Sequence, residues 1–500
     1  MGITSLDIAL LFLSGVLVKK ALSRPSAAPL PPGPRGWPLL GNLLDMPTSR
    51  EWLTFADWGR KWGDIVSISM FGHCMVVVNS MQMAIDMLEK EGAIYSDRPV
   101  MEMGGELVGW KTTLVLVPYG ARFRNYRKLF HQTIGTQSSM AKFYPGGELE
   151  TRRFLKRVLE NPDDLNAHVR KTAGSIILRI SHGYKVKESD DPFVNMADIA
   201  TEQFALSTAP GGFLVNLVPV LKYIPSWFPG AGFKKTAAEW AVSLAKMAND
   251  PHQFVKEQMA HGVAEDSFTS RLLSEPGLTE EQEFDIKWSA ASLYSGGADT
   301  TVASVNAFFL AMALHPEVMR KAQEEIDSVI GNERLPCFAD RPNLPYVNAV
   351  QLEVFRWHSV APTGVPHRVM EDNIFNGFFI PKGALVIPNI WGMTHDPNVY
   401  PNPTAFQPER FLGSKPAPDP KLMTFGFGRR ICPGRVLADA SVFMSIAMSL
   451  AVFNITVSDK DAAPVHEQMT GTISHPKPFK CSITARSSKA AELILSDRDD

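Results

Sequence analysis

The stretch FGFGRRICPG, residues 425–434, decides how this 500-residue chain is interpreted. Cys432 stands directly before an apolar segment, Gly434–Phe453, whose spacing predicts a helix. A sulfur at a helix N-terminus lies near the positive end of the helix dipole and near free amide protons, which stabilise a thiolate. Arg430 offers a forked cation to a carboxylate, while Gly428 and Gly434 allow a positive φ and a close approach to a flat ligand. The alternative is a buried structural cysteine, the commoner fate of a lone cysteine.

The composition favours a globular enzyme with a large core. Hydrophobic residues make up 45% of the chain and charged residues 20%, which excludes wholesale disorder. Lys and Arg number 50 against 52 Asp and Glu, so the chain has no overall basic field that would hold nucleic acid. The cysteines are too few and too scattered for a disulfide framework or a zinc site, and we expect them to be reduced. They are Cys74, Cys337, Cys432 and Cys481.

The N-terminal segment Ile3–Val18 predicts a single-pass membrane anchor. As a helix its 16 residues would span ~24 Å, short of a hydrocarbon core of ~30 Å, and bilayer thinning narrows the difference. No basic residue precedes the apolar run, which argues against a cleaved signal peptide, and the lack of a charged face argues against an interfacial helix. Lys19 and Lys20 follow it, so the positive-inside rule places the rest of the chain in the cytosol.

After the anchor, residues 1–20, we expect a stiff proline-rich hinge at residues 21–42 and one catalytic domain at residues 43–500. Hydrophobic periodicity predicts a mainly α fold with small sheets. Helices are expected at Met81–Lys90, Gly120–His131, Asp285–Leu314, Pro316–Ile330, Leu344–Val360 and Gly434–Phe453. Strand pairs are expected between Ile65–Met70 and Met75–Asn79, and between Ile374–Ile380 and Ala384–Pro388. No GxGxxG motif follows a strand, so the chain is not expected to bind a nicotinamide or flavin itself.

The segment Leu221–Lys235, LKYIPSWFPGAGFKK, places Tyr223, Trp227 and Phe228 among prolines and glycines. One interpretation is a packed loop between helices. The other is an exposed apolar loop that touches a bilayer or controls substrate access.

The segment Gly296–Thr301, GGADTT, interrupts an otherwise apolar predicted helix. Two adjacent glycines weaken a helix and favour a local kink. Thr300 is able to donate a hydrogen bond to a carbonyl one turn back. A carboxylate such as that of Asp299 is costly to place in apolar surroundings. Two interpretations explain its presence: it is a functional acid, or it forms a structural ion pair.

Taken with these segments, the 425–434 loop resembles the haem-binding loop of the cytochrome P-450 family, FxxGxRxCxG. Five fixed residues at these offsets match by chance roughly once in ten thousand chains of this length. Gly296–Thr301 is similar to the family's AGxDT(T/S) segment, Glu353–Arg356 to its ExxR motif and Pro408–Phe411 to its PERF segment, all in the family's order. ExxR alone is weak evidence, although residues at i and i+3 share a helix face and are able to pair.

The resemblance implies a mainly α cytochrome P-450 fold around haem b, with Cys432 as the axial ligand of the iron. The loop residues implied to shape the cofactor site are Phe425, Gly428 and Gly434. The basic residues implied to bind the haem propionates are Arg127, His367 and Arg430. Phe123 replaces the family's tryptophan beside Arg127, which removes one donor. A surface salt bridge is the alternative for Arg127, and a satisfied core histidine the alternative for His367.

The resemblance also assigns residues to proton delivery and to a structural network. Asp299 and Thr300 are implied to form an acid–alcohol pair that relays protons to dioxygen. Glu353, Arg356 and Arg410 are implied to form a buried charge network with a structural role.

The implied reaction uses dioxygen, two electrons and two protons to convert an apolar substrate R–H into R–OH and water. Electrons would come from an NADPH-cytochrome P-450 reductase, so that NADPH acts only indirectly. Segments expected to line the substrate pocket are Val100–Val117, Ala291–Thr301, Ala361–Pro366 and Gly471–Ser474. Their small apolar residues suit a terpenoid, a polyketide or an aromatic molecule.

Within the family, Gly104–Trp110 and Trp227–Lys234 are similar to fungal microsomal members of secondary metabolism, of the O-methylsterigmatocystin oxidoreductase type. This similarity implies a location on the endoplasmic reticulum membrane, with the catalytic domain facing the cytosol. Two alternatives stay open: a haem-thiolate isomerase or dehydratase that needs no reductase, and a non-enzymatic haem binder such as a gas sensor. The Asp299–Thr300 pair argues against the isomerase, which needs no proton relay to dioxygen.

Overall fold

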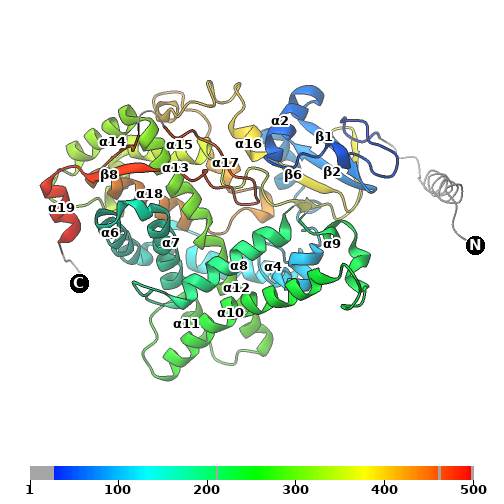
Figure 1. The fold of residues 1–500 in the computed structure, drawn as a ribbon, viewed down its shortest axis with the longest axis horizontal. Helices are drawn as coiled ribbons and strands as arrows, with labels where there is room; N and C mark the ends of the chain where they lie inside the picture. The colour runs from blue at the N-terminus through cyan, green and yellow to red at the C-terminus, as the bar shows by residue number, and fades with distance from the viewer. Residues whose placement is uncertain (1–27, 210–211, 460–462, 497–500) are drawn as a thin grey trace, which may run out of the picture. The chain divides into compact units, whose positions relative to one another are not determined.

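The computed structural model describes residues 28–209, 212–459 and 463–496 (Figure 1). The predicted anchor, residues 1–20, and the first part of the predicted hinge lie outside the described residues. Within the described part, two helical stretches are long and apolar enough to cross a membrane, Glu280–Leu314 and Arg435–Val452. In the most apolar 18 residues of each stretch, 72% of the residues are buried inside the protein, as expected of core helices.

The described chain forms two compact units. The first contains the described residues up to Pro99 together with Thr363–Met393 and Phe427–Arg430. The second contains Val100–Pro362, Thr394–Gly426 and the described residues from Ile431 onward.

The first unit is built on a four-stranded sheet with the order β1-β2-β6-β3. Its strands are β1 (Ile65–Met70), β2 (His73–Val78), β3 (His367–Arg368) and β6 (Leu385–Pro388). β2 pairs with β1 in antiparallel and with β6 in parallel orientation. The amphipathic helix α2 (Glu51–Trp62) lies beside these strands and buries Phe55 and Trp58 against them (Figure 1). The unit also contains α3 (Met81–Ala84), which continues as a π-helical turn at Ile85–Lys90.

One predicted strand pair is wrong. The segment Ile374–Ile380 is not a single strand but a hairpin of β4 (Asn373–Phe375) and β5 (Phe378–Ile380), and β6 pairs with β2 and β3 instead. Asn376 and Gly377 both have positive φ, of 48° and 81°. An Asn-Gly pair of this conformation is a preferred two-residue hairpin turn, which the strand pattern alone conceals.

The second unit is mainly helical, as predicted. Its longer helices are α4 (Ala121–Ile134), α6 (Tyr144–Glu160), α7 (Leu165–His182), α8 (Pro192–Thr208), α10 (Gly232–Ala260), α12 (Glu280–Ala298), α13 (Thr300–Leu314), α14 (Pro316–Val329), α15 (Pro345–Trp357) and α18 (Arg435–Val452). Its short helices and strands are α5 (Gln137–Met140), α9 (Leu214–Leu217), α11 (Phe268–Leu273), α17 (Lys421–Thr424), α19 (Ser488–Leu495), β7 (Phe453–Val457) and β8 (Cys481–Ala485). A further short helix, α16 (Ile390–Thr394), carries the chain from the first unit to the second.

The core of the second unit forms around α13 and α18, because both are apolar on all sides. Phe308, Phe309 and Phe443 are fully buried there. Figure 1 shows α6 beside α7 and α8 beside α10, pairs that also share extensive contacts. The predicted helix Asp285–Leu314 exists as α12 and α13 with a break at Asp299, as the two glycines before it suggested.

Candidate active site

The loop that carries Cys432 is fixed by contacts within the second unit. The Cys432 backbone N–H donates a hydrogen bond to the Phe425 carbonyl oxygen at 2.8 Å, which closes the loop before α18 begins. The Phe425 ring packs edge-on against Phe355 of α15, with 5.6 Å between ring centroids. Arg127 of α4 donates a hydrogen bond from Nη1 to the Ile431 carbonyl oxygen. Two core helices therefore determine where the sulfur lies.

The electrostatic surroundings of Cys432 differ from those of two other cysteines. Burial raises the pKa of the Cys432 thiol, while a hydrogen bond from the Gly434 backbone N–H and the charges of Arg127 and Arg435 act to lower it. For Cys74 and Cys481, burial alone raises the pKa, to about 11 and about 12. Cys432 thus has amide and cationic groups that favour a thiolate, as its position before a helix predicted.

Gly428 and Gly434, the two loop glycines expected to have a positive φ, differ in their backbone conformation. The expectation that Gly434 has a positive φ is wrong, because its φ is −85°. A Cβ placed on Gly434 would approach only the Cys432 Sγ, at 3.9 Å, so space is open beside the sulfur. Gly428 does have a positive φ, of 56°, but a Cβ there would overlap the carbonyl oxygen of Leu88. Gly428 therefore allows the loop to approach the π-helical turn of the first unit closely.

Three buried basic side chains gather in the first unit, and two of them, His367 and Arg430, were predicted. Arg430 donates from Nε to the Ser96 carbonyl oxygen at 2.7 Å, and His367 donates from Nδ1 to the Tyr95 carbonyl oxygen at 2.7 Å. The third is Arg98, which donates from Nη1 to the carbonyl oxygens of residues 365 and 366. Sequence reasoning missed Arg98, because no motif marks it and its partners are more than 260 residues away.

The charges of this cluster favour an anion. Burial, together with the positive charges of Arg98 and Arg430, lowers the pKa of His367 to about 3. Burial also lowers the pKa of Arg98, Arg430 adds to the effect, and Asp97 opposes it. Because basic groups that depress one another's pKa gain from a nearby anion, the cluster is suited to bind carboxylates.

Asp299 lies at the break between α12 and α13 and contacts two basic side chains. Its carboxylate lies 3.0 Å from Arg170 Nη1 and 3.1 Å from His475 Nε2. Burial acts to raise the pKa of Asp299, but the hydrogen bond from His475 and the charges of His475 and Arg170 outweigh it, and the pKa lies below its ordinary value. The ion pair that the sequence left open as an alternative is therefore present.

The residues around the break between α12 and α13 leave open space on one side of the backbone. Thr300 donates a hydrogen bond from Oγ1 to the Gly296 carbonyl oxygen at 2.8 Å, one turn back, as predicted. A Cβ placed on Gly296 would meet nothing within 4 Å, whereas one on Gly297 would lie 2.8 Å from Ile177 Cδ1 of α7. Gly297 thus allows close helix packing, and Gly296 leaves open space next to Thr300.

The structure brings Glu353, Arg356 and Arg410 together in the second unit. Arg356 and Glu353 form two hydrogen bonds of 2.7 and 2.8 Å, and both side chains are fully buried. Arg410 Nε lies 3.2 Å from the same carboxylate. The remaining donors of Arg356 bind the carbonyl oxygens of Thr394, Pro403 and Ala405. A buried network this complete stabilises the segment that follows α16, which is a structural role.

The family profile described as cytochrome P-450 matches residues 31–483 of the chain. This chain belongs to the cytochrome P-450 family. Cytochrome P-450 monooxygenase 208 of Postia placenta is 54% identical over 94% of this chain and 92% of its own length. Cytochrome P-450 monooxygenase claR of Ampulloclitocybe clavipes is 50% identical over 99% and 93%. O-methylsterigmatocystin oxidoreductase of Aspergillus flavus is 39% identical over 97% and 93%.

As a cytochrome P-450, the protein belongs to haem-dependent oxidoreductases with a cysteine thiolate ligand and electrons supplied by a reductase. The residues present fit such a cofactor in three respects. The Cys432 sulfur has open space beside it, the Gly296 backbone leaves open space next to Thr300, and Arg98, His367 and Arg430 form a cluster suited to carboxylates.

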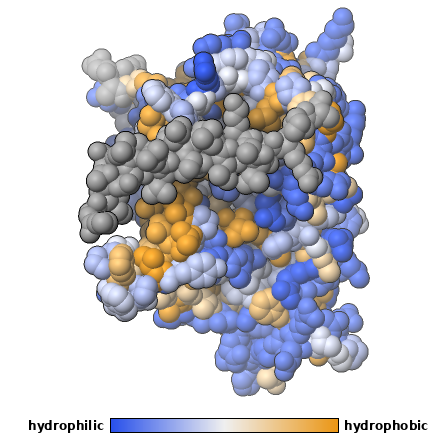
Figure 2. Space-filling model, turned by 90° about the vertical axis from the view of Figure 1, so that its right-hand side faces the viewer, coloured by the Kyte–Doolittle hydropathy of each residue, from blue (hydrophilic) through white to orange (hydrophobic). Residues whose placement is uncertain are grey.

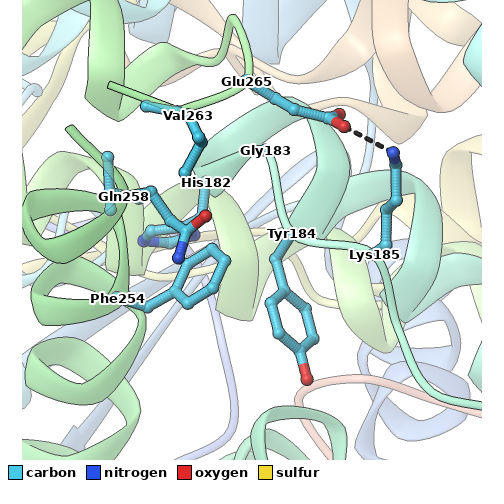
Figure 3. A pocket seen from close by; sticks show the side chains of 10 residues that line it. His182, Gly183, Tyr184, Lys185, Phe254, Gln258, Val263 and Glu265 are labelled. Carbon is cyan, nitrogen blue, oxygen red and sulfur yellow. Dashed lines mark ion pairs between the residues drawn. The ribbon is translucent and has the colours of Figure 1, made fainter. Parts of the chain in front are cut away.

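Two cavities of this cytochrome P-450 lie within its second unit. A space of about 10 Å³, enough for one water, is bordered by Thr301, Val305 and Ser441. A cavity of about 310 Å³ lies at the end of α7, and none of the predicted site residues lines it (Figure 3). Two of the segments predicted to line the substrate pocket contribute to a large apolar cluster of the unit, through residues such as Met103, Trp110 and Leu293.

Proposed function

We propose that this chain is a haem-thiolate monooxygenase in which Cys432 is the axial ligand of haem iron. The observation that carries the proposal is the half-buried Cys432 sulfur itself, which accepts a hydrogen bond from the Gly434 N–H and is approached by the charges of Arg127 and Arg435. A thiolate needs this combination, because amide dipoles and cations offset part of the cost of burying its charge. Haem, when bound, supplies the activation of dioxygen, and the protein supplies orientation and protons.

The basic residues are assigned to the carboxylates of the cofactor. Arg98, His367 and Arg430 would bind propionates, and so would Arg127 if it exchanges its bond to the Ile431 carbonyl oxygen for a carboxylate. An anion would raise the depressed pKa of His367 and favour its protonated form. Phe425, Gly428 and Gly434 would shape the loop around the haem.

Asp299 and Thr300 are assigned to proton delivery. Thr300 Oγ1 would receive a proton from Asp299 and pass it toward the reacting oxygen, which requires it to release the Gly296 carbonyl oxygen. Asp299 would take its protons from His475 Nε2, which already contacts its carboxylate. Arg170 would hold the carboxylate in place between transfers.

The substrate is proposed to be a small apolar molecule of fungal secondary metabolism, a terpenoid, a polyketide or an aromatic compound. The apolar residues of the predicted pocket segments support this class. One relative is named for oxidising O-methylsterigmatocystin, and others are named only as fungal monooxygenases. The balanced reaction converts R–H, dioxygen, two electrons and two protons into R–OH and water.

The protein is proposed to act on the cytosolic side of the endoplasmic reticulum membrane, with residues 1–20 as anchor, 21–42 as hinge and 43–500 as catalytic domain. Electrons would come from an NADPH-cytochrome P-450 reductase. Within the described residues, Tyr223, Trp227 and Phe228 are exposed, with 81% of Trp227 accessible, so the segment Leu221–Lys235 is not a packed loop. Its exposure supports contact with the bilayer.

The decisive experiment is the reduced, carbon-monoxide-bound absorption spectrum of Cys432→Ala. We expect the thiolate signature to disappear in Cys432→Ala and to persist in Cys481→Ala, since Cys481 has no cationic neighbour that shifts its pKa. A thiolate signature unchanged in Cys432→Ala would refute the ligand assignment.

A second measurement separates the proposal from a reductase-independent isomerase or dehydratase. Co-expression with a reductase and feeding of candidate apolar metabolites should give oxygen consumption coupled to product. Product formed without oxygen consumption would favour the isomerase, and haem ligand binding without any turnover would favour a gas sensor.

A further inference from the structure

A cavity of about 310 Å³ opens at the C-terminal end of α7, away from every residue assigned to catalysis. Figure 3 shows His182, Phe254 and Gln258 on one side of it, Lys185 and Glu265 on the other, and Tyr184 between them. Its volume lies at the lower end of the range of small-molecule sites.

The walls of the cavity are aromatic and aliphatic. The rings of Tyr184 and Phe254 meet edge to face, with 5.1 Å between centroids and 89° between planes. Tyr184 donates its hydroxyl proton to Asp191 at 2.8 Å, so that only its ring is available to a ligand. Val255 and Val263 complete the apolar surface. Aromatic rings in this arrangement favour another aromatic ring as a guest.

One ring nitrogen of His182, a buried residue that lines the cavity, has no hydrogen-bond partner among the described residues. Ser181 Oγ donates its single proton to the Ile177 carbonyl oxygen at 2.7 Å, so at 2.8 Å it must accept the proton of His182 Nδ1. Burial lowers the pKa of His182 to about 3, helped by the nearby His252, and the ring is therefore neutral. Its Nε2 is left as an acceptor on a side chain that is only 3% exposed.

The charged groups at the cavity neutralise one another. Lys185 Nζ lies 2.5 Å from Glu265 Oε1, and both side chains are largely exposed, which places this ion pair at the rim. The remaining polar group, the Gln258 amide, is uncharged. A ligand that enters therefore meets no net charge, and an ionised ligand would lose its hydration without compensation.

The cavity wall is held in place by packing and hydrogen bonds of the protein itself. Gly183 ends α7 with φ of 64°, and a Cβ there would lie 3.1 Å from the Glu265 backbone oxygen, so the loop packs closely on it. Thr269 donates to the Ser181 carbonyl oxygen and Ser270 to the Glu265 carbonyl oxygen, both at 2.8 Å. A fixed wall lowers the entropic cost of binding.

We propose that this cavity is a second small-molecule site that binds an uncharged aromatic molecule bearing a hydroxyl group, which donates its proton to His182 Nε2. The site goes beyond the proposed monooxygenase function and does not depend on it.

The test is a calorimetric titration of the haem-loaded full chain with 2-naphthol. The haem pocket is first saturated with 1-phenylimidazole, whose binding to iron is followed by absorption, so that the haem site is monitored separately. We expect one equivalent of 2-naphthol to bind. 2-Methoxynaphthalene, which has no donor, should bind about tenfold more weakly, as the loss of one hydrogen bond predicts.

Variants locate the site. Val263→Trp should abolish 2-naphthol binding by filling the mouth, and it is expected to fold because Val263 is 61% exposed. The matched control is Val242→Trp on α10, where Val242 is 55% exposed and does not line the cavity. His182→Phe should remove the preference for 2-naphthol over its methyl ether.

Three results would overturn the proposal: no binding of 2-naphthol, equal binding of both naphthalenes, or unchanged binding in Val263→Trp. Because Val263→Trp changes an exposed side chain, the test stands even if His182→Phe does not fold. None of these results depends on turnover, so failure here is distinct from failure of the proposed monooxygenase.

Discussion

At the scale of single residues, Asp299 is held in its charged form although it is buried. Burial alone would raise its pKa, and the hydrogen bond from His475 with the charges of His475 and Arg170 reverses the direction. A carboxylate that is to give up and take back protons has to leave these partners. Asp299 is therefore held in an ion pair, which the proposed proton relay would have to break.

We predict that His475→Leu destabilises the protein by about 1.5–3 kcal/mol at pH 7, the usual worth of a hydrogen bond to a charged group. Because the folded-state pKa of Asp299 is lowered, its contribution is present above its ordinary value of 3.8 and is lost as the pH falls through the folded value. The gap between wild type and variant, measured by urea unfolding, should therefore be full at pH 7 and narrow below about pH 4. His475→Gln keeps a donor and should retain most of the stability, and an equal loss in both variants would contradict this account.

The residues that sequence reasoning found and missed differ in one physical respect. Cys432, Glu353 and Thr300 belong to local motifs whose function depends on neighbours within a few positions, and a single sequence shows them. Arg98 and His475 act through partners far along the chain, 176 residues away in the case of His475 and Asp299. No spacing rule connects such pairs, because only the folded backbone brings them together.

At the scale of elements, the break between α12 and α13 depends on two glycines with different surroundings. Gly296 has open space where a side chain would be, and Gly297 faces Ile177 of α7 at 2.8 Å. The sequence predicted a kink from the pair but not which glycine is required for packing.

We expect Gly297→Ala to destabilise the protein by about 1–3 kcal/mol, because the buried Ile177 has to move. Gly296→Ala should instead stabilise it by up to about 1 kcal/mol, since alanine favours helix and meets nothing. Urea unfolding measures whether Gly297→Ala is less stable, and Gly296→Ala more stable, than the wild type. If the open space next to Thr300 is where dioxygen binds, Gly296→Ala should also lower product formation despite its greater stability. A stabilised Gly297→Ala would show that the contact with Ile177 does not restrict packing.

Arg356 joins α15 to the segment that follows α16, and every N–H of its guanidinium has an acceptor. Lysine has three donors on one nitrogen and is unable to bind these acceptors together. We predict that Arg356→Lys costs about 3–5 kcal/mol in the free energy of unfolding, the usual cost of breaking a buried ion pair. Arg410→Lys should cost less, because three of its hydrogen bonds are 3.4–3.5 Å long. Urea unfolding measures both losses. If Arg356→Lys and Arg410→Lys lower the free energy of unfolding equally, the number of hydrogen-bond donors does not explain the loss.

Periodicity predicted the helices of the second unit better than the strands of the first. Long helices such as the amphipathic α14 and the apolar α18 begin and end near proline, glycine and changes of polarity that the sequence displays. The hairpin β4–β5 was missed because seven residues of suitable composition conceal a turn at Asn376 and Gly377. Strand pairing depends on partners elsewhere in the chain, as the parallel pairing of β2 with β6 shows.

At the scale of the whole molecule, net charge and exposed hydrophobic side chains indicate which kinds of partner the protein is able to bind. A formal charge of −2 offers no attraction to nucleic acid, whereas exposed apolar side chains favour a membrane. Figure 2 looks onto the side where α9 lies in Figure 1 and shows hydrophobic side chains gathered there. Large apolar residues exposed in and after α9 are Leu214, Val220, Tyr223, Trp227 and Phe228.

If this surface enters a bilayer, Trp227 should enter with it, because its side chain is 81% exposed. Its indole is therefore an intrinsic fluorescent probe of membrane contact. We predict that vesicles containing brominated phosphatidylcholine quench the tryptophan fluorescence of the full chain, and that Trp227→Phe loses a large part of this quenching. Bromine quenches only at short range, so quenching that depends on Trp227 reports that this indole itself enters the bilayer. The matched control is Trp357→Phe, which removes a buried indole and should leave the quenching unchanged. Equal quenching of wild type and Trp227→Phe would show that the loop stays in water, and its exposed rings would then have to serve substrate access instead.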